Sequence, residues 1–339
     1  MIAKLFHHWE RRLVSVTTDR VVRPFEWGLD WIPSNSEASG LPPEAILADW
    51  VDRVMSDTES FFHVPSTDDY QLDGETLTFP SAYVSPHSQN NVVRVRYFPA
   101  RRHGAPRARR AVLVLPHWNA QEDAHVGLCR VLARVGISAL RLSLPYHDQR
   151  MPPELHRADY VVSSNVGRTV QVCRQAVLDS RRAIAWLDRE GYDRIGILGT
   201  SLGSCLALLT MAHEPLIRAA AFNHISPFFA DVVWNGLSTA HVRAGLEGSI
   251  DLDRLRAMWL PISPLPYLKR LPGKKILLVY ARYDLSFPVA LSRMLVDEFR
   301  RLDVSPEVFV LPCGHYSTGI APFSWIDGFV LTRFLSRWL

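Results

Sequence analysis

The chain has 339 residues, of which 47% are hydrophobic and 21% charged, a composition typical of a soluble globular protein that buries a large core. Its formal net charge of +4 is too small to indicate a nucleic-acid partner, so we predict none. The four cysteines occur without C-x-x-C spacing, which favours buried thiols in a reducing compartment over a disulfide or zinc framework. We therefore expect a cytoplasmic protein.

The first 70 residues predict a helical extension. Apolar residues at helical spacing indicate a helix over 2–14, and Pro42 and Pro43 suit the start of a second helix over 43–62. Charges within the first segment and the lack of a small-residue cleavage site argue against a secretory signal, and no uncharged apolar run is long enough to span a bilayer. We expect helix 2–14 to pack on the remainder of the chain; association with a membrane surface is the alternative.

From about residue 71 the sequence predicts strands that alternate with helices. Two segments, 77–84 and 90–99, indicate an antiparallel hairpin, and the Arg-rich segment 101–110 that follows predicts a solvated loop. Compact apolar strands are then predicted at 111–116, 137–145, 194–199, 219–225, 274–280 and 307–312, and helices at 121–134, 165–189, 202–213, 288–302 and 322–338. Strands this apolar, separated by helices, are typical of an α/β fold with a mostly parallel central sheet and helices on both faces.

Residues 227–272 interrupt this alternation between two predicted strands. The segment is rich in Trp, Phe, Leu and Pro, and we expect it to form a small helical cap over the strand ends. The predicted organisation is therefore an N-terminal helical extension over 1–70 and one α/β domain over 71–339 that carries the cap insertion.

The stretch GTSLG, residues 199–203, lies where a predicted strand turns sharply into a predicted helix. A G-x-S-x-G sequence in this position is the signature of a nucleophile elbow. Side chains at Gly199 and Gly203 would collide with neighbouring backbone, and the free N–H groups of the helix start favour an anion beside Ser201. We predict that Ser201 is a nucleophile; the alternative is a tight turn in which the glycines serve packing alone.

A serine hydroxyl needs a base to take its proton. Asp284 and His315 each come just after a predicted strand, so both are expected at the carboxyl edge of the sheet, where open α/β folds bind ligands. The chain order Ser201, Asp284, His315 is that of the α/β-hydrolase triad. The alternatives are that Asp284 caps a helix, that Asp231 is the acid instead, and that His315 is an ordinary loop histidine.

The oxyanion that forms in acyl transfer needs two N–H donors. We expect one from the backbone of Leu202, which follows the nucleophile, and the other from Trp118, with Asn119 as the second choice. We predict that the substrate pocket is lined by His117, Asn119, Tyr146 and His147. His224, which also follows a predicted strand, is expected to line it too.

Two further predictions concern charge and metal binding. Arg150 is expected to pair with Asp148, with contact to an anionic part of the substrate as the alternative. The histidines lack the spacing of a metal-ligand motif such as HExxH, so we predict no metal and no cofactor.

At these residues the chain resembles the α/β-hydrolase superfamily, from about residue 75 to the end of the sequence. The motifs that carry the resemblance are the elbow GTSLG, the acid turn ARYDLSFP, the histidine turn PCGHYS and the oxyanion loop LPHWN. The stretches LSLPYHDQRMP, SSNVGRTVQ and AIAWLDREGYDRIGILGTSLG are similar to a poorly characterised branch of α/β-hydrolase-domain-containing proteins. The resemblance implies a serine hydrolase fold and indicates no particular substrate.

Together these features predict a serine hydrolase that cleaves a carboxylic ester through an acyl-enzyme intermediate. The aromatic, apolar cap favours a small-molecule ester or acyl substrate, although the same residues also suit a core within the cap. The alternatives are an acyltransferase, a lipid-directed hydrolase at a membrane surface, and a non-catalytic binding protein on the same fold. The sequence does not indicate an oligomeric state.

Overall fold

The computed structural model describes residues 2–33, 40–100 and 109–339. The loop predicted over 101–110 therefore lies, apart from its last two residues, outside the described residues. The strands are β1 (Gln71–Asp73), β2 (Thr76–Pro80), β3 (Val92–Phe98), β4 (Arg110–Leu115), β5 (Ser138–Leu142), β6 (Arg194–Thr200), β7 (Ile217–Asn223), β8 (Lys275–Ala281) and β9 (Glu307–Leu311). Within the described residues they form a nine-stranded sheet in the order β1-β2-β3-β5-β4-β6-β7-β8-β9.

The sheet is mostly parallel. The pairs β1–β2, β2–β3 and β3–β5 are antiparallel, whereas β5–β4, β4–β6, β6–β7, β7–β8 and β8–β9 are parallel. The predicted hairpin corresponds to β2 and β3. The parallel part of the sheet, which carries the alternating helices, confirms the predicted fold class.

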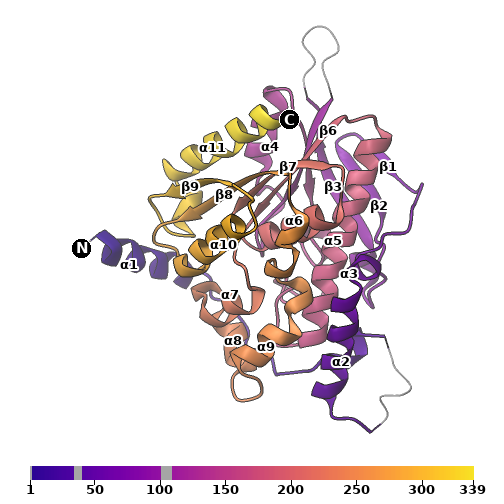
Figure 1. Ribbon diagram of the computed structural model, residues 1–339, viewed down its shortest axis with the longest axis vertical. Helices are drawn as coiled ribbons and strands as arrows, with labels where there is room; N and C mark the ends of the chain where they lie inside the picture. Colours follow the sequence, from indigo (N-terminus) through magenta and orange to yellow (C-terminus); the bar gives the residue numbers. More distant parts are fainter. Residues whose placement is uncertain (1, 34–39, 101–108) are drawn as a thin grey trace.

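Helices cover both faces of this sheet (Figure 1). They are α1 (Ile2–Ser15), α2 (Pro43–Ser56), α3 (Thr58–Phe61), α4 (Val126–Arg134), α5 (Val166–Arg189), α6 (Leu202–His213), α7 (Phe229–Asn235), α8 (Ala240–Leu246), α9 (Leu252–Met258), α10 (Val289–Arg301) and α11 (Phe323–Trp338). α4 and α11 pack on one face, and α5, α6 and α10 pack on the other. Successive strand residues point to opposite faces of the sheet. Val112 and Val114 of β4 therefore lie in the core beneath α4 and α11, whereas Leu113 and Leu115 lie in the core beneath α5, α6 and α10.

Two predicted helices have different boundaries in the structure. The helix expected over 43–62 is broken at Asp57, whose carboxylate accepts a hydrogen bond from Ser60 N at 3.0 Å and so begins α3. The helix expected over 121–134 begins five residues later, as α4. Its N-cap residue, His125, has a φ of 67°, a conformation that a continuous right-handed helix excludes.

The N-terminal extension and the cap both pack on the α/β core. Leu47 and Trp50 of α2 belong to the same hydrophobic core as α5 and α6, so residues 43–62 share a core with the sheet. The division of the chain at residue 70 stays a prediction. The cap consists of α7, α8 and α9 with short 3-10 turns, inserted between β7 and β8. Among the helices of the described residues, none combines the length and the apolarity that crossing a bilayer requires.

Candidate active site

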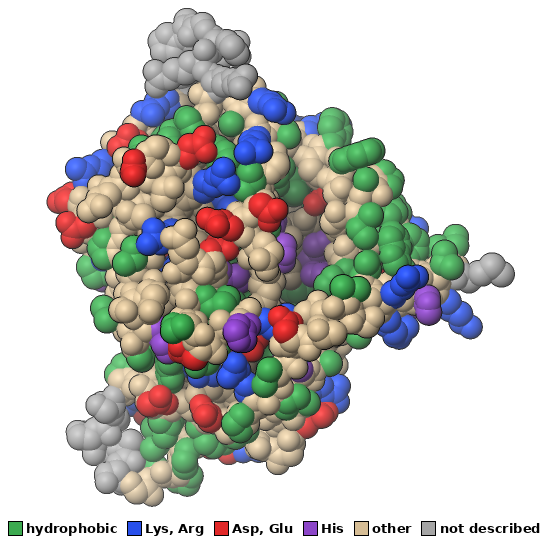
Figure 2. Space-filling model, turned by 180° about the vertical axis from the view of Figure 1, so that it is seen from behind, with side chains coloured by type: hydrophobic (Ala, Val, Ile, Leu, Met, Phe, Trp, Pro, Cys, Tyr) green, Lys and Arg blue, Asp and Glu red, His purple; other side chains and the backbone are tan. Residues whose placement is uncertain are grey.

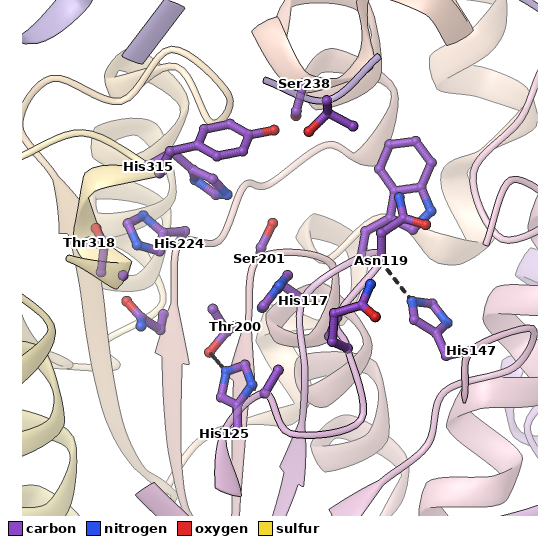
Figure 3. A pocket seen from close by; sticks show the side chains of 18 of the residues that line it. His117, Asn119, His125, His147, Thr200, Ser201, His224, Ser238, His315 and Thr318 are labelled. Atoms are coloured by element: carbon purple, nitrogen blue, oxygen red, sulfur yellow. Dashed lines mark hydrogen bonds between the residues drawn. The ribbon is translucent and has the colours of Figure 1, made fainter. Parts of the chain in front are cut away.

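Four side chains follow the carboxyl ends of four neighbouring parallel strands. Ser201 follows β6, His224 follows β7, Asp284 follows β8 and His315 follows β9. Because these strands are adjacent in this order, their ends meet at one edge of the sheet. Figure 3 shows Ser201, His224 and His315 around one cavity. The structure thus places the three residues of the predicted triad at the same edge.

Ser201 lies on a strained turn between β6 and α6. Its backbone has φ 57° and ψ −120°, a combination that costs a non-glycine residue free energy and is typical of functional sites. A Cβ at Gly199 would overlap the backbone of Gly203, and a Cβ at Gly203 would overlap the Leu115 carbonyl oxygen. The predicted steric reason for both glycines is therefore confirmed. The turn is fixed further by Ser201 N, which donates to Asn223 O at 2.7 Å.

Backbone strain of this kind is concentrated around the cavity. Residues with positive φ that also line the cavity are Asn119, His125, Asp148, Ser201 and His224. Each such position costs free energy that the surrounding packing must offset. The cavity wall is therefore held in a fixed arrangement by the fold around it.

The Asp284 carboxylate is a buried acceptor of four hydrogen bonds. Its Oδ1 accepts from Ser286 N at 2.8 Å and from Phe287 N at 2.7 Å. Its Oδ2 lies 3.0 Å from His224 Nδ1 and 2.9 Å from His315 Nδ1. Burial opposes ionisation, but the charge of His315 and the hydrogen bonds from both imidazoles outweigh it and hold the pKa of Asp284 well below its ordinary value. Asp284 therefore fixes its own turn with one oxygen and two imidazoles with the other.

His315 is held between Asp284 and an aromatic ring. Because an ionised carboxylate only accepts hydrogen bonds, Nδ1 of His315 must carry a proton, which leaves Nε2 free to accept one. The imidazole stacks on Phe287 with 5.3 Å between ring centroids. Burial favours the neutral ring, but Asp284 outweighs it and raises the pKa of His315 above its ordinary value, with a smaller contribution from Glu10.

His224 is a partner of Asp284 that sequence reasoning placed only in the pocket wall. Burial lowers the pKa of His224, although its hydrogen bond to Asp284 opposes this shift. Its Nε2 is buried and has no hydrogen-bond partner among the described residues. The available signal was topological: β7 lies between the serine strand and the acid strand, so the residue after β7 must lie between Ser201 and Asp284.

Of the two backbone donors predicted for an oxyanion, Leu202 directly follows the serine and Trp118 lines the same cavity. Leu202 is the first residue of α6, and the first N–H groups of a helix have no acceptor within the helix. Asn119 N donates to His147 Nε2 at 2.9 Å, so the second-choice donor is already engaged. No hydrogen bond from Trp118 N is found within the described residues, which leaves Trp118 as the candidate for the second donor.

The cavity has a volume of about 990 Å³. Figure 2, which shows the molecule from the side opposite to Figure 1, shows histidine side chains gathered in a hollow of the surface. Predicted site residues that line it are His117, Trp118, Asn119, His147, Ser201, His224 and His315.

Tyr146 was predicted to line the substrate pocket, and the structure differs from this prediction. It is absent from the described lining, its side chain is fully buried, and its hydroxyl lies 3.1 Å from His87 Nδ1. Tyr146 therefore packs behind the cavity wall.

The predicted pairing of Arg150 with Asp148 is wrong. Arg150 is completely buried and binds the Asp179 carboxylate of α5 at 2.7 Å, while Asp148 binds Arg141 at 2.8 Å. Because the guanidinium of Arg150 is turned into the core and donates to the carbonyls of Asn90 and Ser143, it cannot contact an anionic substrate either. Asp231, the alternative acid, is bound by Arg256 at 2.7 Å.

Three other cavity histidines are neutral near pH 7. Burial lowers the pKa to about 4 for His117 and His147 and to about 3 for His125. His147 Nε2 accepts from Asn119 N, and His125 Nε2 lies 3.0 Å from Thr200 Oγ1 (Figure 3). The rings of His147 and His125 therefore act as hydrogen-bonding groups in the cavity wall.

One group of described side chains has the composition of a metal site. Ligand atoms of His224, Asp284 and His315 lie within 4.8 Å of one another. The distances of 3.0 and 2.9 Å between Nδ1 and Oδ2 are those of hydrogen bonds, so we assign these atoms to a hydrogen-bond network. The absence of a metal or cofactor in the reaction stays a prediction.

Comparison with known families decides the class of the protein. The model of the family Alpha/beta hydrolase domain containing 18 matches residues 78–256, which is more than half of the chain. The chain belongs to this family. The matched segment includes Ser201 and ends before Asp284 and His315. The predicted resemblance to an α/β-hydrolase-domain branch is thereby confirmed, and the protein is an α/β-hydrolase enzyme.

Solved structures share the fold at low sequence identity. Acetyl xylan esterase 1 from Thermoanaerobacterium has a TM-score of 0.62 and 13% identity, with 86% of this chain and 93% of that chain covered. An acetyl xylan esterase from Paenibacillus has a TM-score of 0.60 and 13% identity, covering 91% and 98%. The acylaminoacyl peptidase of Pyrococcus horikoshii has a TM-score of 0.61 and 13% identity over 80% of this chain, which spans only 42% of the peptidase. The comparison with curated proteins found no match to this chain.

Proposed function

We propose that this α/β-hydrolase cleaves carboxylic esters with Ser201 as nucleophile, His315 as base and Asp284 as the acid that orients the base. The supporting observation is the 2.9 Å contact of His315 Nδ1 with Asp284 Oδ2 at the rim of the cavity that Ser201 also lines. This contact leaves Nε2 as the basic nitrogen of His315. The strained turn at Ser201 supports the same role, because it presents the hydroxyl at the end of the sheet.

The proposed reaction has two acyl-transfer steps. His315 Nε2 accepts the Ser201 proton while Oγ attacks the ester carbonyl carbon, and the imidazolium that forms is stabilised by Asp284. The N–H groups of Leu202 and Trp118 stabilise the oxyanion. The carbon–oxygen bond of the ester then breaks, and the alcohol leaves with the proton from His315. Water repeats the sequence: it loses a proton to His315, attacks the acyl-enzyme, and releases the acid and free Ser201.

The cavity suits a small-molecule ester. Its wall combines apolar side chains such as Leu128, Met151 and Leu331 with the neutral histidines, which provides an apolar surface for an acyl chain beside polar groups for the ester. Of the three solved structures described above, two are named as esterases and one as a peptidase. Esters are chemically easier to cleave than amides, and we therefore place esters first. Transfer of the acyl group to an acceptor other than water would use the same residues.

Labelling with a fluorophosphonate probe tests the nucleophile. Wild-type protein should be labelled, and Ser201→Ala should not be. Ser56→Ala is a matched control, because Ser56 is exposed on α2 and, within the described part of the chain, its hydroxyl bonds only to Arg53 O. A panel of nitrophenyl esters of increasing acyl length then identifies the preferred substrate. Labelling that persists in Ser201→Ala, or folded wild-type protein that is never labelled, would overturn the proposed role of Ser201.

Hydrolysis of lipids at a membrane surface is the second candidate. It is favoured by exposed apolar side chains on two helices that touch through Phe6 and Phe323. Leu5 of α1 is 73% exposed, and Trp325 and Phe329 of α11 are 73% and 64% exposed. Sedimentation with liposomes tests this candidate: if it is right, Leu5→Glu combined with Trp325→Glu should abolish binding. Wild-type protein that stays in the supernatant would exclude it.

A further inference from the structure

We infer that Glu10 of α1 is a positioning residue of the active site, because its carboxylate holds the loop that carries His315. This inference rests on the proposed role of His315. The inference gives the N-terminal helix α1, which carries no recognised motif, a role in positioning His315. Figure 1 shows α1 beside the β8–β9 end of the sheet, where the acid and histidine loops emerge.

Glu10 is a buried carboxylate bound by backbone amides. Its side chain is 0% exposed, and within the described residues it forms no ion pair with a lysine or arginine. A buried charge without compensation is costly. Compensation comes from Tyr316 N, which donates to Oε2 at 2.8 Å, and from Ser317, whose N and Oγ donate to Oε1 at 3.0 and 2.7 Å. These donors are the two residues that directly follow His315.

Gly314 provides the space for this carboxylate. A Cβ at Gly314 would overlap the carboxyl group of Glu10, so the glycine of the histidine turn is needed for the approach of α1. Gly314 N in turn donates to Ser317 Oγ at 2.8 Å. The residues on both sides of His315 are therefore tied, directly or through Ser317, to the same carboxylate of α1.

α1 also contacts the loop that carries the acid. The ring of Phe6 stacks on Tyr283, the neighbour of Asp284, with 4.7 Å between centroids and 11° between planes. Tyr283 N donates to Cys313 O at 2.9 Å, which joins the acid loop to the histidine loop. Two successive turns of one helix, at Phe6 and Glu10, thus brace both loops, and the relative position of Asp284 and His315 depends on this helix.

The charge of Glu10 also acts on the imidazole. Titratable groups that face His315 are Asp284 from the β8 loop, His224 from the β7 loop, His117 from the β4 loop, Glu10 from α1 and Tyr316 beside it. Two of these, Asp284 and Glu10, are carboxylates, and both favour the protonated form of His315. Glu10 therefore has a positional effect on the loop and an electrostatic effect on the proton affinity of the base.

Kinetics of Glu10→Gln on the full chain test both effects. The variant should lower kcat for a nitrophenyl ester by at least ~10-fold, since small displacements of catalytic groups are costly, while KM changes much less. The acid limb of the pH profile should move to lower pH, because a neutral side chain no longer favours the imidazolium. A role in folding alone would not move this limb. Glu75→Gln is the matched control, since Glu75 is exposed on the β1–β2 hairpin.

Glu10→Asp carries the test if Glu10→Gln fails to fold. It keeps the charge but withdraws it from the loop, so kcat should fall while the acid limb stays near the wild-type pH. Wild-type kcat and an unchanged acid limb in a folded Glu10 variant would overturn the inference. Ester turnover that survives in Ser201→Ala would instead overturn the proposed function, so the two failures are distinguishable.

Discussion

The imidazole rings of His224 and His315 lie 4.6 Å apart between centroids, and both direct Nδ1 at the same oxygen of Asp284. The two rings are not equivalent. The side chain of His224 is 2% exposed, against 14% for His315, and its pKa is lowered while that of His315 is raised. In the proposed mechanism the proton of Ser201 is therefore transferred to His315, while His224 remains a neutral donor that holds the carboxylate.

The pH profile should reveal the competition for Asp284. For the wild type we expect the acid limb of kcat/KM to have its midpoint above about pH 6.5, the ordinary pKa of histidine, because His315 must be neutral to act as base. In His224→Ala the Asp284 oxygen loses one donor and binds His315 more strongly, so the midpoint should rise further. kcat should fall by about 10-fold as the carboxylate becomes less well fixed.

His224→Asn is the control for this prediction. Its side-chain N–H can occupy a place close to that of Nδ1, so it should restore much of kcat and return the midpoint toward the wild-type value. Equal pH profiles for wild type and His224→Ala would contradict the view that the two imidazoles compete for one carboxylate oxygen.

Substitution of the acid should distinguish Asp284 from Asp231. Asp284→Asn removes the charge that stabilises the imidazolium and lets the amide oppose the required tautomer, so kcat should fall by at least ~10²-fold. Asp231→Asn loses the ion pair with Arg256 and should affect thermal stability more than kcat. Steady-state kinetics of the two variants decide the assignment. The reverse ranking would transfer the role of acid to Asp231.

Some of this site could be predicted because its signals are local in sequence. The strand, glycines and helix that surround Ser201 are contiguous, and a parallel sheet brings the residues after its strands to one edge whatever lies between them. That rule placed Asp284 and His315 at the carboxyl edge of the sheet. The same rule, applied to β7, would have placed His224 beside Asp284.

The missed contacts are side-chain partnerships between elements far apart in the chain. Glu10 binds residues that lie 306 and 307 positions away, and no periodicity in α1 indicates which loop its charge contacts. The partner of Arg150 was sought two residues away but lies on α5, 29 residues away. Such pairs depend on how separate helices pack on the sheet, and sequence spacing does not determine that packing.

The buried pair of Arg150 and Asp179 should contribute to stability and not to turnover. Both side chains are 0% exposed, so Arg150→Met leaves an uncompensated carboxylate in the core. We expect the free energy of unfolding to fall by roughly 3–5 kcal/mol, measured by urea denaturation. Arg150→Met with Asp179→Leu should recover part of the loss. kcat per folded molecule should stay close to wild type, and a selective loss of activity toward anionic esters would contradict the structural role.

Asp327 of α11 should make the free energy of unfolding depend on pH, independently of the pH profile of catalysis. Asp327 is one of the residues that line the cavity. Its carboxyl group accepts one hydrogen bond from Asn223 Nδ2 at 2.8 Å and has no partner for Oδ1 among the described residues. Burial raises the pKa of Asp327 to about 7, although the Asn223 hydrogen bond opposes this shift. In the unfolded chain the same group titrates near pH 3.9, as for ordinary aspartate.

The sign of the effect follows from these two pKa values. Below about pH 3.9 the group is protonated in both states, and its contribution to stability is fully present. As the pH rises toward about 7, the unfolded chain gains a charge that the folded protein resists, so this contribution is lost. Asp327→Asn keeps the shape without the charge and should be more stable than wild type at pH 8, by on the order of 4 kcal/mol, with little difference at pH 4. Urea denaturation at both pH values measures this difference; an equal difference at both would mean that folding does not raise the pKa of Asp327.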